Sequence, residues 1–476
     1  MRTAALAVPV LVLQGCSSAG IVAVAPSPGI PTPPSQSGTP APEASTAAPV
    51  MPPAPASITF IENDYARALG DARARHVPIF IDTWATWCHT CLSMRSYVFP
   101  DPALRPFAGR FVWLSVDTER EENAPLVTKL GVRVLPTLFV VDSSTEKSVL
   151  AWPGSLTATE LAQLLPDAEL ATHPDEAGSD ASRALLRGHQ ASAAGDDGEA
   201  ITAYRAALAE APPGWARRAQ AVDGLVTRLG EAKQLAACVT VGADEAPKLP
   251  PGTALADVLR AAMGCADDLP AKAPEHRRLA ELATLGERVA MDRAQPILAD
   301  DRSDLFDYVV HALRSLPHRP PQEITRVARA WATFLEGEAA HAPDPAARAV
   351  FDAHRLLAYE AVGAPERAVP MLQQSERDFP DDYNPPARLA SAFLQMKHYD
   401  EALVAVRRAL GRAYGPRKLR LWSLQADILE ARKDRAGARQ ALTEALEFAK
   451  TVQLTGGYPK LKDALEKRLE KLGPAK

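Results

Sequence analysis

A pair of cysteines three residues apart follows directly on a short apolar run. Residues 77–81 (Val-Pro-Ile-Phe-Ile) predict a buried strand, and Cys88 and Cys91 lie where a helix is expected to begin after it. A Cys-x-x-Cys at a strand-to-helix junction is typical of a redox pair. The unpaired backbone N–H groups of the helix N-terminus would stabilise a Cys88 thiolate, and Cys91 would return to the same face one turn later. The spacing therefore predicts two sulfurs that can exchange a disulfide.

The sequence around this pair alternates between helical and strand patterns. We expect helices at 61–75, 91–98, 101–108 and 124–130, and further strands at 111–116, 138–141 and 149–152. A last helix is expected after Thr157, because Thr157 and Glu160 have the spacing of a capping box. This order of elements predicts an α/β sandwich.

Two motifs in this region resemble those of a known family. Residues 82–91 read Asp-Thr-Trp-Ala-Thr-Trp-Cys-His-Thr-Cys, and residues 134–138 read Val-Leu-Pro-Thr-Leu. Together they resemble the thioredoxin family over roughly residues 58–165. The aromatic stretch at 97–102 is most similar to the C-terminal thioredoxin domain of DsbD-type electron carriers. The resemblance implies a thioredoxin fold, with helices flanking a central mixed sheet, and a thiol–disulfide oxidoreductase activity.

The resemblance also implies roles for individual residues. Four would carry the catalysis: the nucleophile Cys88, the resolving thiol Cys91, the buried acid Asp82 and the cis proline Pro136. Asp82 would relay a proton to Cys91, and the backbone before Pro136 would pair with an extended substrate segment. Other positions would support the site: Trp87, His89, Leu135 and Gly154.

His89 is the departure from the family pattern, which commonly has small, apolar or Gly-Pro residues between the cysteines. A protonated His89 would stabilise the Cys88 thiolate further and make the pair more oxidising. A neutral, solvated His89 would change little. Both alternatives stay open at the level of sequence, and so does the redox direction.

Two other interpretations of the cysteine pair are weaker. A zinc site would need a second pair or nearby histidines, but Cys238 and Cys265 lie far apart and no two of the ten histidines have ligand spacing. We therefore expect no metal and no cofactor. A permanent structural bridge would not require Trp84, Asp82 or Pro136 beside it. The enzyme interpretation itself requires the two sulfurs to lie close together and open to solvent.

Residues 182–476 have a different composition, rich in Ala, Leu, Arg and Glu. Small and apolar residues recur there at spacings that resemble tetratricopeptide repeats: Ala200, Tyr204, Ala207 and Pro212, then Ala368, Leu372, Ser375 and Pro380. We therefore expect an all-α repeat domain over 182–476, joined by a linker at 166–181. Such arrays normally bind a protein partner, and the alternative is a spacer.

Cys238 and Cys265 fall in two adjacent helices expected in this region. A simple hairpin that turns between residues 242 and 252 would place Cys238 opposite Leu259. Cys265 would then lie about 9 Å too far along the helix axis to form a disulfide. We therefore favour buried free thiols, and a disulfide formed in an oxidising periplasm stays open as the alternative.

The N-terminus has the pattern of an exported, anchored protein. An apolar stretch at 4–13 ends in Leu-Gln-Gly-Cys16, which resembles a bacterial lipobox. We expect a signal peptide at 1–15, a lipid on Cys16 and a disordered Pro/Ala/Ser-rich linker at 16–57. An ordinary secretory signal with a chance cysteine is the alternative. The expected location is the bacterial cell envelope, facing the periplasm, with the outer membrane favoured over the inner one.

These features together predict a membrane-anchored periplasmic thiol–disulfide oxidoreductase that acts on protein disulfides and binds a partner through its repeats. The net charge of −5 gives no indication of a nucleic-acid partner. The alternative is an assembly lipoprotein in which the repeats do the work and the thioredoxin-like domain is a docking module. A reductase dedicated to cytochrome maturation is a narrower alternative.

Overall fold

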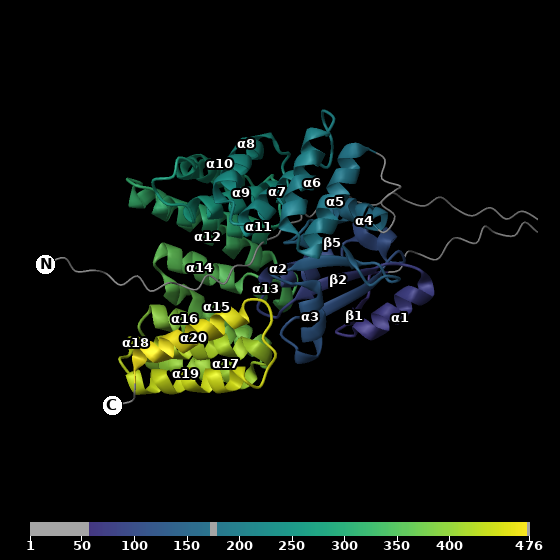
Figure 1. The fold of residues 1–476 in the computed structure, drawn as a ribbon. Helices are drawn as coiled ribbons and strands as arrows, with labels where there is room; N and C mark the ends of the chain where they lie inside the picture. The colour runs from purple at the N-terminus through teal and green to yellow at the C-terminus, as the bar shows by residue number, and fades with distance from the viewer. Residues whose placement is uncertain (1–56, 172–178, 474–476) are drawn as a thin grey trace, which may run out of the picture.

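The computed structural model describes residues 57–171 and 179–473. They form an α/β domain at 60–170 and a helical domain at 180–472, which lie side by side (Figure 1). The expected signal peptide, the lipidation site Cys16 and the linker through residue 56 lie outside the described residues.

Five strands form one mixed sheet in the order β1-β3-β2-β4-β5. β1, β3 and β2 run parallel, and β4 runs antiparallel to both β2 and β5. The strands are β1 (Phe60–Glu62), β2 (Ile79–Trp84), β3 (Val112–Asp117), β4 (Thr137–Val141) and β5 (Ser148–Pro153). The predicted α/β fold with a central mixed sheet is therefore confirmed.

Helices cover both faces of this sheet. Side chains alternate between the faces along β2, so that Phe80 points to one hydrophobic cluster and Ile81 to the other. The Ile81 face packs against α1 (Tyr65–Arg75) and α3 (Ala124–Leu130). The Phe80 face packs against the π-helix η1 (Met94–Val98), the 3₁₀-helix η2 (Pro102–Phe107) and α4 (Ala158–Leu170).

Two details of the predicted elements are wrong. The helix expected from residue 61 starts only at Tyr65, because Ile61 pairs with Leu114 in the sheet and Asp64 caps the helix by accepting the Arg67 N–H at 2.9 Å. The helix expected at 91–98 begins earlier, as α2 (His89–Ser93), and continues as η1. The capping box of Thr157 and Glu160 forms as predicted at the start of α4.

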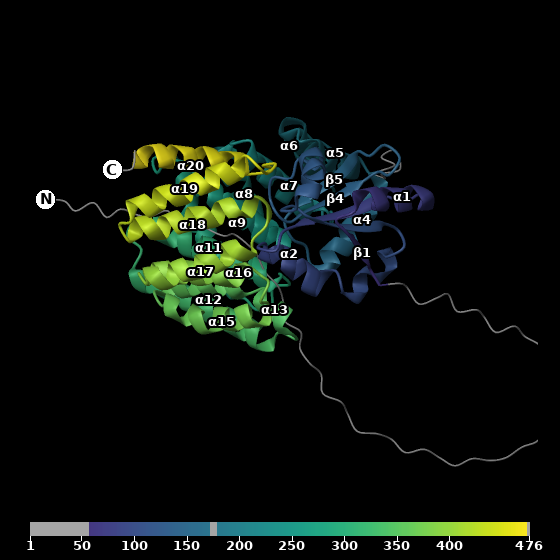
Figure 2. The same cartoon turned by 90° about the horizontal axis from the view of Figure 1, so that it is seen from below.

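The helical domain consists of helices that pack pairwise against their neighbours (Figures 1 and 2). Its first half contains α5 (Asp180–Ala194), α6 (Asp197–Ala209), α7 (Arg218–Glu231), α8 (Leu235–Glu245), α9 (Thr253–Asp267), α10 (Leu279–Met291), α11 (Ala299–Ser315) and α12 (Pro321–His341). Its second half contains α13 (Pro345–Ala349), α14 (Asp352–Val362), α15 (Ala368–Asp378), α16 (Asn384–Gln395), α17 (Tyr399–Arg412), α18 (Lys418–Ala431), α19 (Arg435–Ala449) and α20 (Tyr458–Leu472). Among the described residues, no helix is long and apolar enough to span a bilayer.

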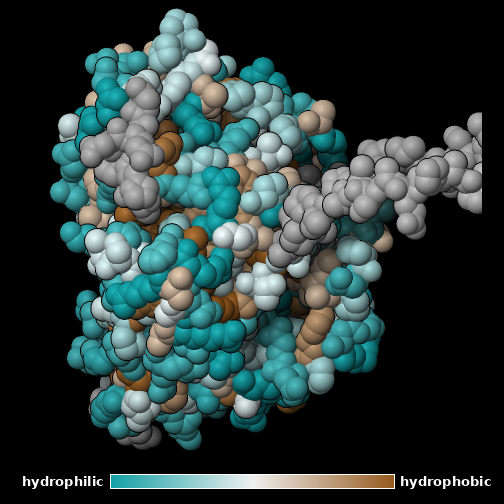
Figure 3. Space-filling view, turned by 90° about the vertical axis from the view of Figure 1, so that its right-hand side faces the viewer, coloured by the Kyte–Doolittle hydropathy of each residue, from teal (hydrophilic) through white to brown (hydrophobic). Residues whose placement is uncertain are grey.

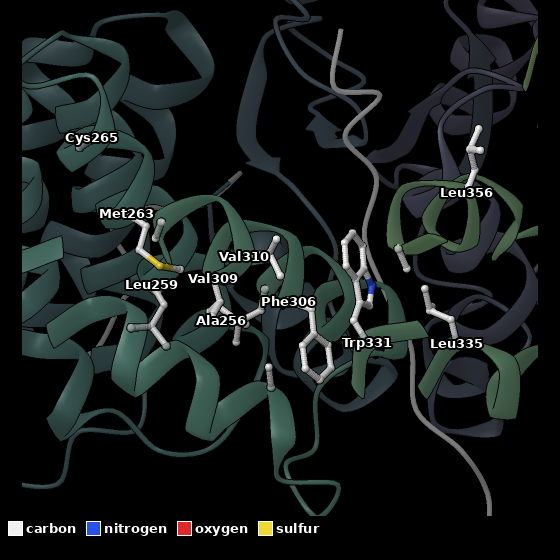
Figure 4. Close-up of a cluster of buried hydrophobic side chains, with 14 of the residues drawn as sticks. Ala256, Leu259, Met263, Cys265, Phe306, Val309, Val310, Trp331, Leu335 and Leu356 are labelled. Atoms are coloured by element: carbon white, nitrogen blue, oxygen red, sulfur yellow. The ribbon is translucent and has the colours of Figure 1, made fainter. Parts of the chain in front are cut away.

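Small residues let these helices approach closely. A Cβ atom added at Gly188 or at Gly224 would lie 2.6 Å from the ring of Tyr204, which is buried between α5, α6 and α7. Larger side chains fill the wider spaces, such as Trp331, Phe306 and Leu335 in the middle of the domain (Figure 4). The Trp331 indole N–H donates to Ser303 Oγ at 2.6 Å, so its polar atom is also satisfied.

Cys238 and Cys265 form a disulfide between α8 and α9, which corrects the expectation of free thiols. Residues 246–252, which include the 3₁₀-helix Ala246–Lys248, shift the register of the hairpin. Gly242 consequently faces Ala262, and Cys238 lies beside Ala261 and Cys265 rather than beside Leu259. The expected hairpin placed its centre several residues too early.

The helical domain contacts the α/β domain on two sides (Figures 1 and 2). On the first side, α5 packs along β5 at the edge of the sheet. Glu160 Oε1 accepts the Thr253 backbone N–H at 2.8 Å, and Ser155 Oγ donates to Asp301 Oδ1 at 2.7 Å. We call this contact the anchoring interface. The second side lies at α2 and carries the candidate site.

Candidate active site

Cys88 and Cys91 lie at the start of α2, directly after β2. Cys88 is the N-cap residue, and its Sγ accepts the Cys91 backbone N–H at 3.2 Å. The two residues are joined by a disulfide, with their Cα atoms 5.3 Å apart. Because the N-terminal N–H groups of a helix point at Cys88, this position favours a thiolate once the bond is reduced. The structure thus brings the two sulfurs together at the place that the sequence predicted.

Asp82 is completely buried in β2, and neither of its carboxyl oxygens has a hydrogen-bond partner among the described residues. Burial raises the pKa of Asp82 to about 7, although the charge of Arg95 acts in the opposite direction. A carboxyl group with this pKa can both take up and release a proton near neutral pH. Asp82 therefore has the chemistry that a proton relay needs.

The loop before β4 contributes the cis proline and an apolar contact. The Leu135–Pro136 bond is cis, and the Pro136 carbonyl accepts the Gly154 N–H at 2.9 Å. Leu135, like Trp87, packs against the two cysteines. The neighbouring Val134 is 46% exposed, which is unusual for a large apolar side chain in this structure. The structure thus places Pro136, Leu135 and Gly154 in one loop cluster beside the disulfide.

His89 is buried and neutral in this conformation. Its Nδ1 lies 3.1 Å from the carbonyl oxygen of Val350, which can only accept, so Nδ1 carries the proton. Its Nε2 lies 3.4 Å from Arg388, and the ring of His354 is 5.2 Å away. Burial and these neighbours lower the pKa of His89 well below its usual value. A protonated His89 therefore does not stabilise a Cys88 thiolate here, and the imidazole is not solvated either.

The helical domain contacts both neighbours of Cys88, because Arg417 lies over Trp87 and Val350 and Arg388 contact His89. Cys88 is 1% exposed and Cys91 is fully buried, so the expectation of sulfurs open to solvent is wrong for this conformation. Residues far along the chain reach the loops around α2: Ala347, Val350, Tyr383, Asn384, Arg388, Tyr414, Arg417 and Tyr458. The sequence interpretation treated the repeats as a separate partner-binding domain and missed this contact.

Glu119 is a buried acid beside the site that sequence reasoning missed. Its Oε1 accepts the indole N–H of Trp87 and the hydroxyl of Tyr458, each at 2.7 Å. Burial raises the pKa of Glu119, which Arg417 partly offsets. The signal was available, because Glu119 follows β3, whose carboxyl end lies at the same sheet edge as that of the parallel strand β2.

Comparisons with known proteins agree with this geometry. Residues 60–143 match the model of a family described as thioredoxin-like. The matched segment contains both cysteines, Asp82 and the cis proline. The α/β domain is a thioredoxin-like domain.

Relatives of the thioredoxin-like domain include thioredoxins and disulfide-interchange proteins. Thioredoxin 1 of Nostoc sp. is 28% identical over 89 residues, which is 19% of this chain and 78% of that protein. The thiol:disulfide interchange protein DsbD of Salmonella typhi is 30% identical over 94 residues, which is 19% of this chain and 17% of that protein. The thioredoxin-like domain, its Cys-x-x-Cys pair and these relatives support a thiol–disulfide oxidoreductase.

A solved repeat protein is also among the structures that are similar to this chain. A tetratricopeptide repeat protein from Parabacteroides merdae is 10% identical, with a TM-score of 0.37, and the match covers 62% of this chain and 100% of that one. Among the described residues, no group of three or more His, Cys, Asp and Glu side chains is arranged to hold a metal ion.

Proposed function

We propose that the protein exchanges disulfides with protein substrates through Cys88 and Cys91, from a lipid anchor in the bacterial envelope. The observation that carries this proposal is the Cys88–Cys91 disulfide at the start of α2, which follows the strand that contains the buried Asp82 and packs against Leu135 beside Pro136. A purely structural bridge would not need an unpaired acid buried in the strand that leads to it.

In the reducing direction, the Cys88 thiolate attacks one sulfur of a substrate disulfide. A bond forms between Cys88 and that sulfur, the substrate bond breaks, and the released thiolate takes up a proton. Cys91 then loses its proton to Asp82 and attacks Cys88, which restores the Cys88–Cys91 disulfide and frees the second substrate thiol. The substrate gains two electrons and the protein loses two. A thiol reductant must supply them again, and the oxidising direction is the reverse of these steps.

Trapping the intermediate tests this mechanism. Replacing Cys91→Ser in the full chain removes the resolving thiol, so mixed disulfides between Cys88 and its substrates should accumulate in cells. The variant Cys88→Ser/Cys91→Ser is the matched control and should form none. The variant Cys238→Ala/Cys265→Ala should reduce insulin as well as the unchanged chain does. Absence of adducts, together with absence of insulin reduction, would rule the mechanism out.

The proposed attachment to a membrane through a lipid rests on the Leu-Gln-Gly-Cys16 motif. Acyl chains on Cys16 would hold the protein at a membrane, since each buried methylene contributes about 0.8 kcal/mol. Labelling cells with a palmitate analogue should mark the protein, and Cys16→Ser should abolish the label and release the protein from membranes. A labelled Cys16→Ser variant would exclude this residue as the acylation site.

One observation favours the rival function, in which the thioredoxin-like domain is a docking module. Thr86, Trp87 and His89, which surround Cys88 in the sequence, are contacted by the helical domain, as a docking surface would be. The two functions differ in their need for sulfur chemistry. A Cys88→Ser strain that behaves like the wild type, while deletion of residues 182–476 causes a strong defect, would support the scaffold.

A further inference from the structure

The contact around Cys88 combines polar groups with the apolar packing of Trp87, Leu92 and Tyr97 against the helical domain. Four tyrosine hydroxyls take part: Tyr383 accepts from Thr86 at 3.1 Å, Tyr414 donates to Asp117 at 2.6 Å, Tyr458 donates to Glu119 at 2.7 Å, and Tyr97 donates to the carbonyl of Ala347 at 3.2 Å. Arg417 lies over the ring of Trp87 at 4.7 Å. The residues of the helical domain that make these contacts belong to residues 345–473, which we call the cap, and α11 also contacts α2.

The anchoring interface uses other helices. It joins β5 and α4 to α5, α9 and α11 through contacts that include Glu160 with Thr253, and Ser155 with Asp301. The hydrogen bonds near α2 and those of the anchoring interface therefore come from different helices, although α14 of the cap packs on α11 and α12 within one continuous hydrophobic cluster. Opening over α2 with the anchoring interface in place requires the cap helices to shift against α11 and α12.

Disulfide exchange cannot take place while the cap contacts α2 and the loops around Cys88. The attacking sulfur must approach a sulfur atom directly, but Cys88 is 1% exposed and Cys91 is not exposed at all. A protein disulfide, which is far larger than a water molecule, has no path to either atom. We infer that the cap holds the Cys88–Cys91 pair in a closed, unreactive state, and that exchange requires the cap to move away. This inference rests on the proposed exchange function.

The character of the contact fits an interface that opens. Polar interfaces between two domains of one chain resemble the interfaces of transient protein–protein complexes. Several buried polar atoms at this contact have no hydrogen-bond partner among the described residues, namely Glu119 Oε2, Arg417 Nε and both ring nitrogens of His354. Each such atom would be hydrated on opening, which favours the open state. The free energy that favours the closed state over the open state is therefore small.

Gly415 shows how closely the cap approaches. It lies in the turn before α18 with φ +56°, and a Cβ atom there would lie 1.9 Å from the carbonyl oxygen of Glu119. Even one methyl group at this position collides with the backbone of the thioredoxin-like domain. Gly363, at the end of α14, has φ +80° and no heavy atom within 4 Å of a Cβ. The two glycines share the backbone strain of a substitution, but only Gly415 faces the contact.

This difference provides a matched test. The oxidised full chain is treated with tris(2-carboxyethyl)phosphine, and the reduction of the Cys88–Cys91 disulfide is followed by alkylation and mass spectrometry of its peptide. Gly415→Ala should accelerate the reduction about tenfold or more, because overpacking a contact destabilises it. Gly363→Ala should stay close to the wild-type rate.

A second pair of variants covers the case in which Gly415→Ala fails to fold. Tyr414→Phe/Tyr458→Phe removes two hydroxyls that donate to buried carboxylates across the contact and should also accelerate reduction. Tyr359→Phe, whose hydroxyl donates to Glu336 inside the helical domain, is its control and should not.

Two results would contradict the inference that the cap keeps the disulfide unreactive. In one, the wild-type disulfide is reduced as fast as in the urea-unfolded chain. In the other, folded variants at the contact are reduced no faster than their controls. Insulin reduction separates this inference from the proposed function. If Gly415→Ala is reduced faster by the phosphine but does not reduce insulin, the closing role of the cap is supported and the proposed enzymatic function is wrong.

Discussion

The imidazole of His89 donates from Nδ1 to the carbonyl of Val350, 261 residues further along the chain, at 3.1 Å. His89 separates the two redox cysteines, and Val350 belongs to the helical domain. The residue that distinguishes this Cys-x-x-Cys motif is therefore also the residue that the helical domain holds.

The titration of His89 should report on this contact. The groups that face it are His354 on α14, Arg388 on α16 and Arg417 before α18, and burial among them lowers the pKa of His89. A lowered pKa means that the imidazole stabilises the closed state above its usual pKa of about 6.5 and does so less as the pH falls below that value. Imidazole NMR of the oxidised chain should show neutral His89 at pH 6. A titration of the His89 imidazole with its midpoint near pH 6.5 would contradict its burial in this contact.

Asp82 should make stability depend on pH in the opposite sense. Its pKa is raised from 3.8 to about 7, so folding is favoured by its proton at low pH and loses that contribution as the pH rises toward 7. From pH 5 to pH 8 the loss amounts to roughly 3 kcal/mol. Urea unfolding of the wild type and of Asp82→Asn at both pH values measures it. The difference between the two proteins should shrink at pH 5, and an unchanged difference would show that Asp82 is not buried with a raised pKa.

Asp82→Asn should also slow disulfide exchange. A positioned acid–base group contributes about 100-fold or more to a proton-transfer step, and asparagine cannot accept the Cys91 proton. The pH profile of insulin reduction should lose its inflection near pH 7 in this variant. The same inflection in the variant would assign the proton relay to another group, for which the buried Glu119 is a candidate.

The Cys238–Cys265 disulfide should matter for stability and not for exchange. It closes a loop between residues 27 apart and lies buried between α8 and α9. Its removal should lower the free energy of unfolding by about 3 kcal/mol. Urea unfolding of Cys238→Ala/Cys265→Ala measures this, with insulin reduction as the control. Loss of insulin reduction in a folded variant would show that the second pair takes part in electron transfer.

Glu160 should stabilise two helices at once. Its Oε2 accepts from Thr157 in the capping box of α4, and its Oε1 accepts the N–H of Thr253 at the first residue of α9. Glu160→Ala should destabilise the chain by about 1–2 kcal/mol in urea unfolding. Glu160→Gln keeps one of the two acceptor oxygens, so it retains one of the two contacts and should lose less than Glu160→Ala. Equal losses would indicate that the charge, and not the hydrogen bonds, is responsible.

Local chemistry explains what could be predicted from the sequence. The capping box at Thr157 and the helix Ala124–Leu130 form as expected, because their signals lie within a few residues. The position of Cys88 at a helix N-terminus also follows from its neighbours alone. The strand at Ile61 was missed because its pairing partner Leu114 is distant in sequence.

The cover over Cys88 could not be predicted for the same reason. Thr86 meets Tyr383 and Glu119 meets Tyr458 across separations of 297 and 339 residues. No periodicity or spacing in a single chain encodes such contacts. The prediction of free thiols at Cys238 and Cys265 was wrong for a more local reason. A few extra residues in one turn changed the register of the two helices.

The central claim is that Cys88 and Cys91 form a redox-active pair. Equilibrating the full chain in glutathione buffers, followed by alkylation and mass spectrometry of the Cys88 peptide, gives the reduction potential directly. We predict a value between about −120 and −270 mV, in the range of disulfide-exchange proteins. A pair that stays oxidised below about −300 mV would be a structural bridge, and the proposed function would then be wrong.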